Sequence, residues 1–119
     1  MTSFDLPAPI ADYIAATNAF DIEAFVATFA DDALVNDHRN EFVGLAAIRD
    51  WAQREIIGDR VTMNCVEATN RGSGVAVTAR IDGNFDKKGL PDPLLLAFYF
   101  TIDNGRIVQL IIVHNKPAA

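Results

Sequence analysis

The chain is poor in the residue patterns that mark several common classes of protein. It has one cysteine, Cys65, among 119 residues, which excludes an internal disulfide framework and a cysteine-rich metal site. Its two histidines, His38 and His114, do not form a His-x-x-x-His pair, so we expect no zinc site. The sequence also has no glycine-rich phosphate loop and no Gly-x-Ser-x-Gly nucleophile motif. We therefore expect neither nucleotide chemistry nor serine hydrolysis, and a protein without metal or cofactor.

Basic residues are scarce as well. The chain has 10 Lys and Arg residues against 16 Asp and Glu residues, a formal net charge of −6. Its longest basic run is Lys87-Lys88. A nucleic-acid partner requires a basic face that displaces counterions from phosphates, and an anionic membrane surface would repel an acidic protein. We expect neither partner.

Long hydrophobic runs are also missing. No segment approaches the ~20 apolar residues of a membrane span, and the first residues lack the basic and apolar regions of a signal peptide. We therefore expect a cytoplasmic protein.

Half of the residues are apolar and 22% are charged, which is enough apolar material for one core. Residues 1–119 are predicted to form a single domain.

The first half of the sequence has helical periodicity. Residues 7–19 carry an apolar stripe at i, i+3, i+4 and i+7, which predicts a helix. Asp21 is placed as the N-cap of a second, short helix whose stripe extends to Phe29. A third helix is predicted over residues 44–56.

The second half has the alternation of strands. Two short strands, residues 33–37 and 41–43, are predicted between the second and third helices. Four longer strands follow: residues 61–70, 75–85, 94–102 and 106–114. Along the strand from Val75, alternate residues are apolar through Ile81, which is typical of a strand with one buried face. Helices followed by long antiparallel strands indicate an α+β fold with the helices packed on the sheet.

Three stretches carry a resemblance to a known family. Residues 13–21 (Tyr-Ile-Ala-Ala-Thr-Asn-Ala-Phe-Asp) are similar to the first-helix signature of bacterial ketosteroid isomerases. Residues 29–33 (Phe-Ala-Asp-Asp-Ala) and 46–49 (Ala-Ala-Ile-Arg) resemble their later segments. The layout resembles the fold shared by nuclear transport factor 2, scytalone dehydratase, ketosteroid isomerases and SnoaL-type cyclases. The resemblance implies a cone-shaped NTF2-like fold, with three N-terminal helices on a curved, mostly antiparallel sheet and a dry pocket for a small apolar molecule.

The resemblance also implies roles for individual residues. Tyr13 falls on the family's oxyanion-binding tyrosine and Asp37 on its proton-shuttling base. Independently, Asp37 continues the face of Ala33 and Val35, so its carboxylate is expected at the end of an apolar stripe. The family's second oxyanion donor, a protonated aspartate, aligns with Ala97, which is a departure from the pattern.

In addition to Ala97, four residues are predicted to bind substrate: Trp51, Tyr99, Ile112 and His114. His114 shares a strand face with Ile112, and Tyr99 shares one with Ala97, so either His114 or Tyr99 could supply the missing donor. Trp51 is placed either over the mouth of the pocket or in the core. His38 follows Asp37 and would point the opposite way in a regular strand, which predicts a surface histidine.

These expectations lead to a functional hypothesis with alternatives. The favoured activity is isomerase-type proton transfer on a small hydrophobic carbonyl compound, with Asp37 as general base and Tyr13 as oxyanion donor. A polyketide cyclase or dehydratase remains open, and so does a non-catalytic module that binds ligand or dimerises. Arg80 is expected on the outer sheet face, which disfavours an epoxide hydrolase. Apolar residues on that outer face, such as Val66 and Ile111, predict a homodimer.

Overall fold

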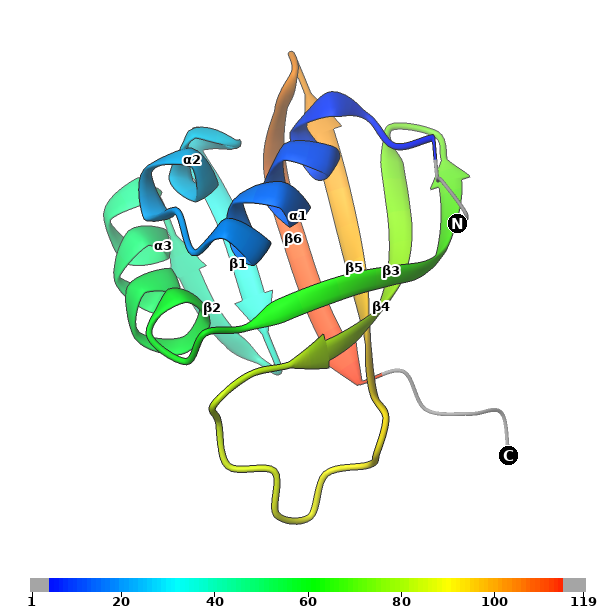
Figure 1. The fold of residues 1–119 in the computed structure, drawn as a ribbon. Helices are drawn as coiled ribbons and strands as arrows, with labels where there is room; N and C mark the ends of the chain where they lie inside the picture. The colour runs from blue at the N-terminus through cyan, green and yellow to red at the C-terminus, as the bar shows by residue number, and fades with distance from the viewer. Residues whose placement is uncertain (1–4, 115–119) are drawn as a thin grey trace.

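The computed structural model describes residues 5–114 and shows three helices on one face of a six-stranded sheet (Figure 1). The helices are α1 (Ala8–Ala19), α2 (Ile22–Ala27) and α3 (Leu45–Ala52), and α3 continues as one π-helical turn, η1 (Gln53–Ile57). The strands are β1 (Phe29–Asp37), β2 (Asn40–Val43), β3 (Thr62–Arg71), β4 (Gly74–Asp82), β5 (Leu94–Asp103) and β6 (Arg106–His114). The predicted α+β architecture is confirmed.

The strand order in the sheet is β2-β1-β6-β5-β4-β3. All neighbouring pairs are antiparallel except β1 and β6, which are parallel. The last strand of the chain therefore lies in the middle of the sheet, beside the first. This pairing brings Asp37, at the end of β1, next to Ile112 near the end of β6.

The helix boundaries follow local chemistry. The Oδ1 atom of Asp21 accepts a hydrogen bond from the Ala24 N–H at 3.1 Å, as an N-cap does. The second helix was predicted to reach Phe29, but α2 ends at Ala27. The Thr28 hydroxyl donates to the Phe25 carbonyl at 2.8 Å, and Phe29 already pairs with β6. Pairing with the sheet ends this helix two residues early.

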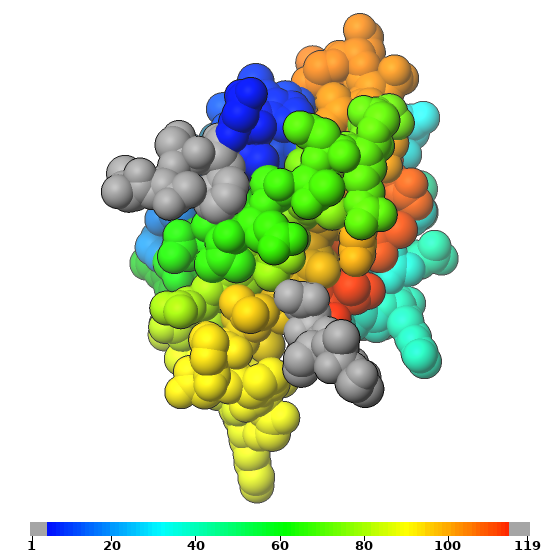
Figure 2. Space-filling model, turned by 90° about the vertical axis from the view of Figure 1, so that its right-hand side faces the viewer, coloured from blue at the N-terminus to red at the C-terminus, as the bar shows by residue number. Residues whose placement is uncertain are grey.

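Strand β4 has the two faces that its sequence predicts. Val75, Val77, Ala79 and Ile81 are all buried. Arg80, on the alternate face, is exposed, which confirms its expected outward placement. The predicted strand was longer, since β4 ends at Asp82 rather than at residue 85. The segment between β4 and β5 projects from the body of the molecule (yellow in Figure 2).

Strand β5 presents alternate residues to the helices. Leu94, Phe98 and Phe100 belong to the buried core. Ala97 and Tyr99 alternate with them, so they lie on the outer face. Tyr99 is 42% exposed and pairs with Ala76 and Ile111 of the neighbouring strands.

Candidate functional site

A cavity of about 230 Å³ lies between the helices, the sheet and the projecting segment. Its walls are mostly apolar: Val61, Met63, Ile81, Leu94, Leu96 and Phe98. The projecting segment contributes Phe85 and Leu90. The volume lies below the ~300–1,000 Å³ typical of pockets for drug-sized ligands, so the cavity suits a small molecule.

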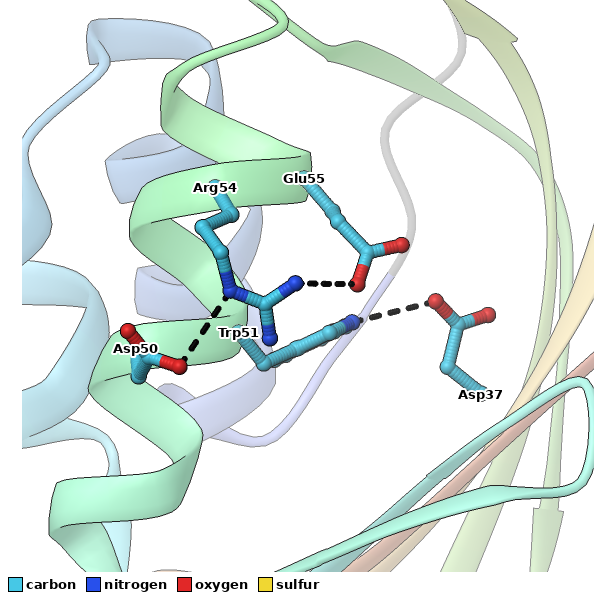
Figure 3. Close-up of polar contacts among 5 residues, drawn as sticks. All are labelled: Asp37, Asp50, Trp51, Arg54 and Glu55. Atoms are coloured by element: carbon cyan, nitrogen blue, oxygen red, sulfur yellow. Dashed lines mark hydrogen bonds and ion pairs between the residues drawn. The ribbon is translucent and has the colours of Figure 1, made fainter.

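Asp37 places a carboxylate in this apolar cavity, as its strand face predicted. Its side chain is 19% exposed. Oδ1 lies 2.6 Å from Nδ1 of His38. Oδ2 accepts a hydrogen bond from Nε1–H of Trp51 at 3.0 Å, which Figure 3 shows. Both carboxylate oxygens are thus held by neighbouring rings, which fixes the direction in which this group points.

The turn after Asp37 changes the position of His38. His38 and Arg39 form a two-residue connection between β1 and β2, and their φ angles are +51° and +77°. Because both backbones are left-handed, the alternation of β1 stops at Asp37, and His38 lines the same cavity. The prediction that His38 points away from Asp37 is therefore wrong, whereas the predicted surface position is confirmed, since 37% of its side chain is exposed.

His38 and His114 meet at this end of the cavity. Their ring centroids are 4.5 Å apart, with an interplanar angle of 55°. The backbone N–H of His38 donates a hydrogen bond to the backbone carbonyl of Ile112 at 3.1 Å, which attaches the turn to β6. The side chains of Asp37, His38 and His114 therefore line the same cavity.

Tyr13 reaches the cavity from α1 and is 1% exposed. Its ring contacts four phenylalanine rings at centroid distances of 4.8 to 6.4 Å: Phe25, Phe29, Phe98 and Phe100. Burial raises the pKa of the Tyr13 hydroxyl above its ordinary value, and the negative charge of Asp37 raises that pKa further. The hydroxyl therefore stays protonated and is available as a hydrogen-bond donor.

The structure does not bring every expected substrate-binding residue into the cavity. Ile112 and His114 line it. Trp51 is fully buried, and its indole stacks on Phe42 at 5.8 Å, so it holds Asp37 from the core rather than covering the mouth. Ala97 and Tyr99 lie on the opposite sheet face, and their predicted place in the pocket is corrected. Successive residues of a strand point to opposite faces, and the residues of β5 that line the cavity are Leu94, Leu96 and Phe98.

Two acidic residues at the cavity were missed from the sequence, Glu55 and Asp59. Glu55 extends from η1, where Nη1 of Arg54 lies 3.4 Å from its carboxylate (Figure 3). Its position four residues after Trp51 was the available signal, because i and i+4 share a helix face. Among the described lining residues none is lysine or arginine.

Nothing in residues 5–114 gathers three or more His, Cys, Asp or Glu side chains into a possible metal site. In the same residues, no helix is both long and apolar enough to cross a membrane.

Three helices on one face of a sheet, with an apolar cavity that contains a carboxylate, have the architecture of a small-molecule-binding domain. The sequence matches the SnoaL-like domain over residues 10–110. The chain therefore belongs to the SnoaL-like family, within the NTF2-like superfamily that the sequence predicted.

Solved structures agree with this assignment. A candidate polyketide cyclase from Sinorhizobium meliloti is 32% identical, with a TM-score of 0.84 over 95% of this chain and 100% of that one. A candidate ketosteroid isomerase from Kribbella flavida is 14% identical, with a TM-score of 0.76 over 95% and 79% of the two chains. TerC, crystallised with polyporic acid, is 15% identical, with a TM-score of 0.76 over 91% and 89%. The last two show the fold alone. No curated protein matches the sequence.

Proposed function

We propose that the chain binds a small hydrophobic carbonyl compound in this cavity and catalyses proton transfer next to the carbonyl, without a cofactor. The observation that carries the proposal is the oriented carboxylate of Asp37 in a mostly apolar cavity. A group that removes an α-proton must be held within reach of its substrate. Asp37 serves as the general base of this reaction.

The negative charge that develops on the carbonyl oxygen needs a donor. The protonated hydroxyl of Tyr13 is such a donor in the same cavity, and a hydrogen bond to an oxyanion is strong where water is excluded. Ala97 supplies no second donor, because its methyl side chain has no polar atom and it also alternates to the outer face of β5. His114 lines the cavity and is the candidate for a second donor.

A cyclase-type reaction is the second candidate. The 32% identity to the candidate polyketide cyclase of Sinorhizobium meliloti favours it. Ring closure by attack of one carbon on a carbonyl also begins with loss of an α-proton, so the same carboxylate serves both reactions. A non-catalytic binding module would retain the cavity but would not need the fixed carboxylate.

The experiment follows the ultraviolet absorbance of two β,γ-unsaturated ketones, cyclohex-3-enone and a ketosteroid, because conjugation changes the spectrum directly. We expect turnover that Asp37→Asn lowers by about 10²–10⁴-fold. Asp32→Asn, on the same strand and exposed, is the matched control and should retain the wild-type rate. Wild-type protein that turns over neither ketone excludes isomerisation, and cyclisable substrates then become the test.

We also propose a homodimer formed through the outer sheet face. Tyr99 and Ile111 pair on adjacent strands of this face, and a tyrosine that is 42% exposed there suits an interface. Sedimentation equilibrium should give twice the monomer mass, and Tyr99→Lys should shift it to the monomer. A monomeric wild-type protein at micromolar concentration contradicts the proposal.

A further inference from the structure

His38, the residue after Asp37, indicates which atom takes the proton from the substrate. We infer that His38 takes the proton from the substrate, and that Asp37 acts through it as a positioning residue. This inference rests on the proposed proton transfer and changes one role in it, because His38 replaces Asp37 as the general base. It assigns the reacting atom to Nε2 of His38 instead of to a carboxylate oxygen.

The contact with Asp37 determines the tautomer of His38. Nδ1 lies 2.6 Å from Oδ1 of Asp37. An ionised carboxylate only accepts hydrogen bonds, so Nδ1 must carry the proton of this contact. In the neutral ring Nε2 then has a free lone pair, which makes it a proton acceptor.

Both oxygens of the Asp37 carboxylate already accept a hydrogen bond. Oδ2 of Asp37 accepts from the buried indole of Trp51, and Oδ1 accepts from His38. Asp37 thus bridges a core residue and a cavity residue. A carboxylate that holds an imidazole in one tautomer, and faces the imidazolium when it forms, is a proven arrangement for proton transfer.

The backbone of the turn brings the side chains of Asp37 and His38 together. A two-residue hairpin with positive φ at both positions favours Asn-Gly, yet this one is His38-Arg39, at +51° and +77°. A non-glycine residue with a positive φ has a strained backbone, and such strain persists where hydrogen bonds and packing around the residue enforce it. Here the Asn36 side chain accepts from the Arg39 N–H at 2.9 Å, and Ile112 accepts from the His38 N–H. The strained turn places two consecutive side chains on one cavity.

The reaction balances without a co-reactant. The α-proton moves to the Nε2 lone pair, and the electrons of the broken C–H bond form an enolate, whose oxygen receives the Tyr13 hydrogen bond. His38 becomes an imidazolium beside the Asp37 carboxylate. The same proton then returns from Nε2 to another carbon of the enolate, which restores neutral His38 and leaves the isomerised ketone.

The main experiment compares His38→Gly with Arg39→Gly in the cyclohex-3-enone assay. Glycine suits the left-handed backbone at both positions, so both variants keep the turn. We expect His38→Gly to lose about 10²-fold or more in rate, and added imidazole to restore part of it. Arg39→Gly should retain the wild-type rate. Activity of His38→Gly within about threefold of wild type overturns the inference, and so does a loss that imidazole leaves unchanged.

A second measurement is independent of turnover. The ¹⁵N shifts of the ring nitrogens report the tautomer, and the chain has two histidines to assign, which His114→Gln separates. We expect neutral His38 with its proton on Nδ1, and loss of that preference in Asp37→Ala. A proton on Nε2 in the wild type overturns the inference. Wild-type protein without turnover instead overturns the proposed function and removes this step with it.

Discussion

The indole nitrogen of Trp51 lies 3.0 Å from Oδ2 of Asp37, and this hydrogen bond joins the end of α3 to the end of β1 (Figure 3). The donor is completely buried, so the direction of the carboxylate is set by the core of the protein. Stability and the geometry of the site therefore depend on the same contact.

Trp51→Phe should destabilise the fold by about 2–3 kcal/mol, because a hydrogen bond to a charged group contributes ~1.5–3 kcal/mol and the smaller ring leaves space in the core. Urea unfolding measures this change. In a double-mutant cycle with Asp37→Ala, the combined loss should be smaller than the sum of the two single losses. Additive losses would show that the contact contributes nothing.

Tyr13→Phe should lower the rate of the proposed proton transfer by about 10²–10³-fold, the usual effect of removing an oxyanion donor. The phenylalanine ring keeps its contacts with the surrounding aromatic rings, so the KM should change much less than kcat. Tyr99→Phe is the matched control, since Tyr99 lies on the outer face. An unchanged kcat in Tyr13→Phe would assign the donor role elsewhere.

The raised pKa of Tyr13 predicts a pH dependence of stability. Below the ordinary tyrosine pKa of about 10, the hydroxyl is protonated in both the folded and the unfolded chain. As the pH rises above that value, the unfolded chain ionises while folded Tyr13 keeps its proton, so stability falls. Tyr13→Phe should lose less stability than wild type between pH 9 and pH 11 in urea unfolding. Equal losses would contradict the burial of this hydroxyl.

Leu96→Trp should reduce ligand binding, whereas Leu95→Trp should not. Leu96 lines the cavity, and Leu95 alternates to the other face of β5, where it pairs with Arg80. The larger side chain at position 96 fills part of the cavity, and we expect affinity for cyclohexanone to fall at least about tenfold by calorimetry. Equal affinities of the two variants would mean that the ligand binds outside this cavity.

The sequence predicts the fold well because its periodicities are strong and local. The alternation from Val75 to Ile81 identifies a buried strand face, and Asp37 is placed correctly because it continues the face of Ala33 and Val35. The N-cap role of Asp21 is equally local, since the residue bonds to a backbone only three positions away.

The site is harder to predict because its geometry depends on exceptions to those periodicities. His38 enters the cavity only because two non-glycine residues take positive φ, which no alternation pattern reveals. Ala97 and Tyr99 were assigned to the pocket from an aligned position, and their strand face reverses that assignment. The contact between Trp51 and Asp37 comes from the packing of α3 on β1, which no local pattern specifies.

The most direct test of the account is exchange of the α-protons of cyclohexanone in D₂O, followed by proton NMR, because it detects proton abstraction without any later step. The account predicts that wild-type protein accelerates exchange above the buffer rate and that Asp37→Asn loses this acceleration. Exchange at the buffer rate with wild-type protein, or equal acceleration by Asp37→Asn, would contradict the claim that this carboxylate makes the cavity a proton-transfer site.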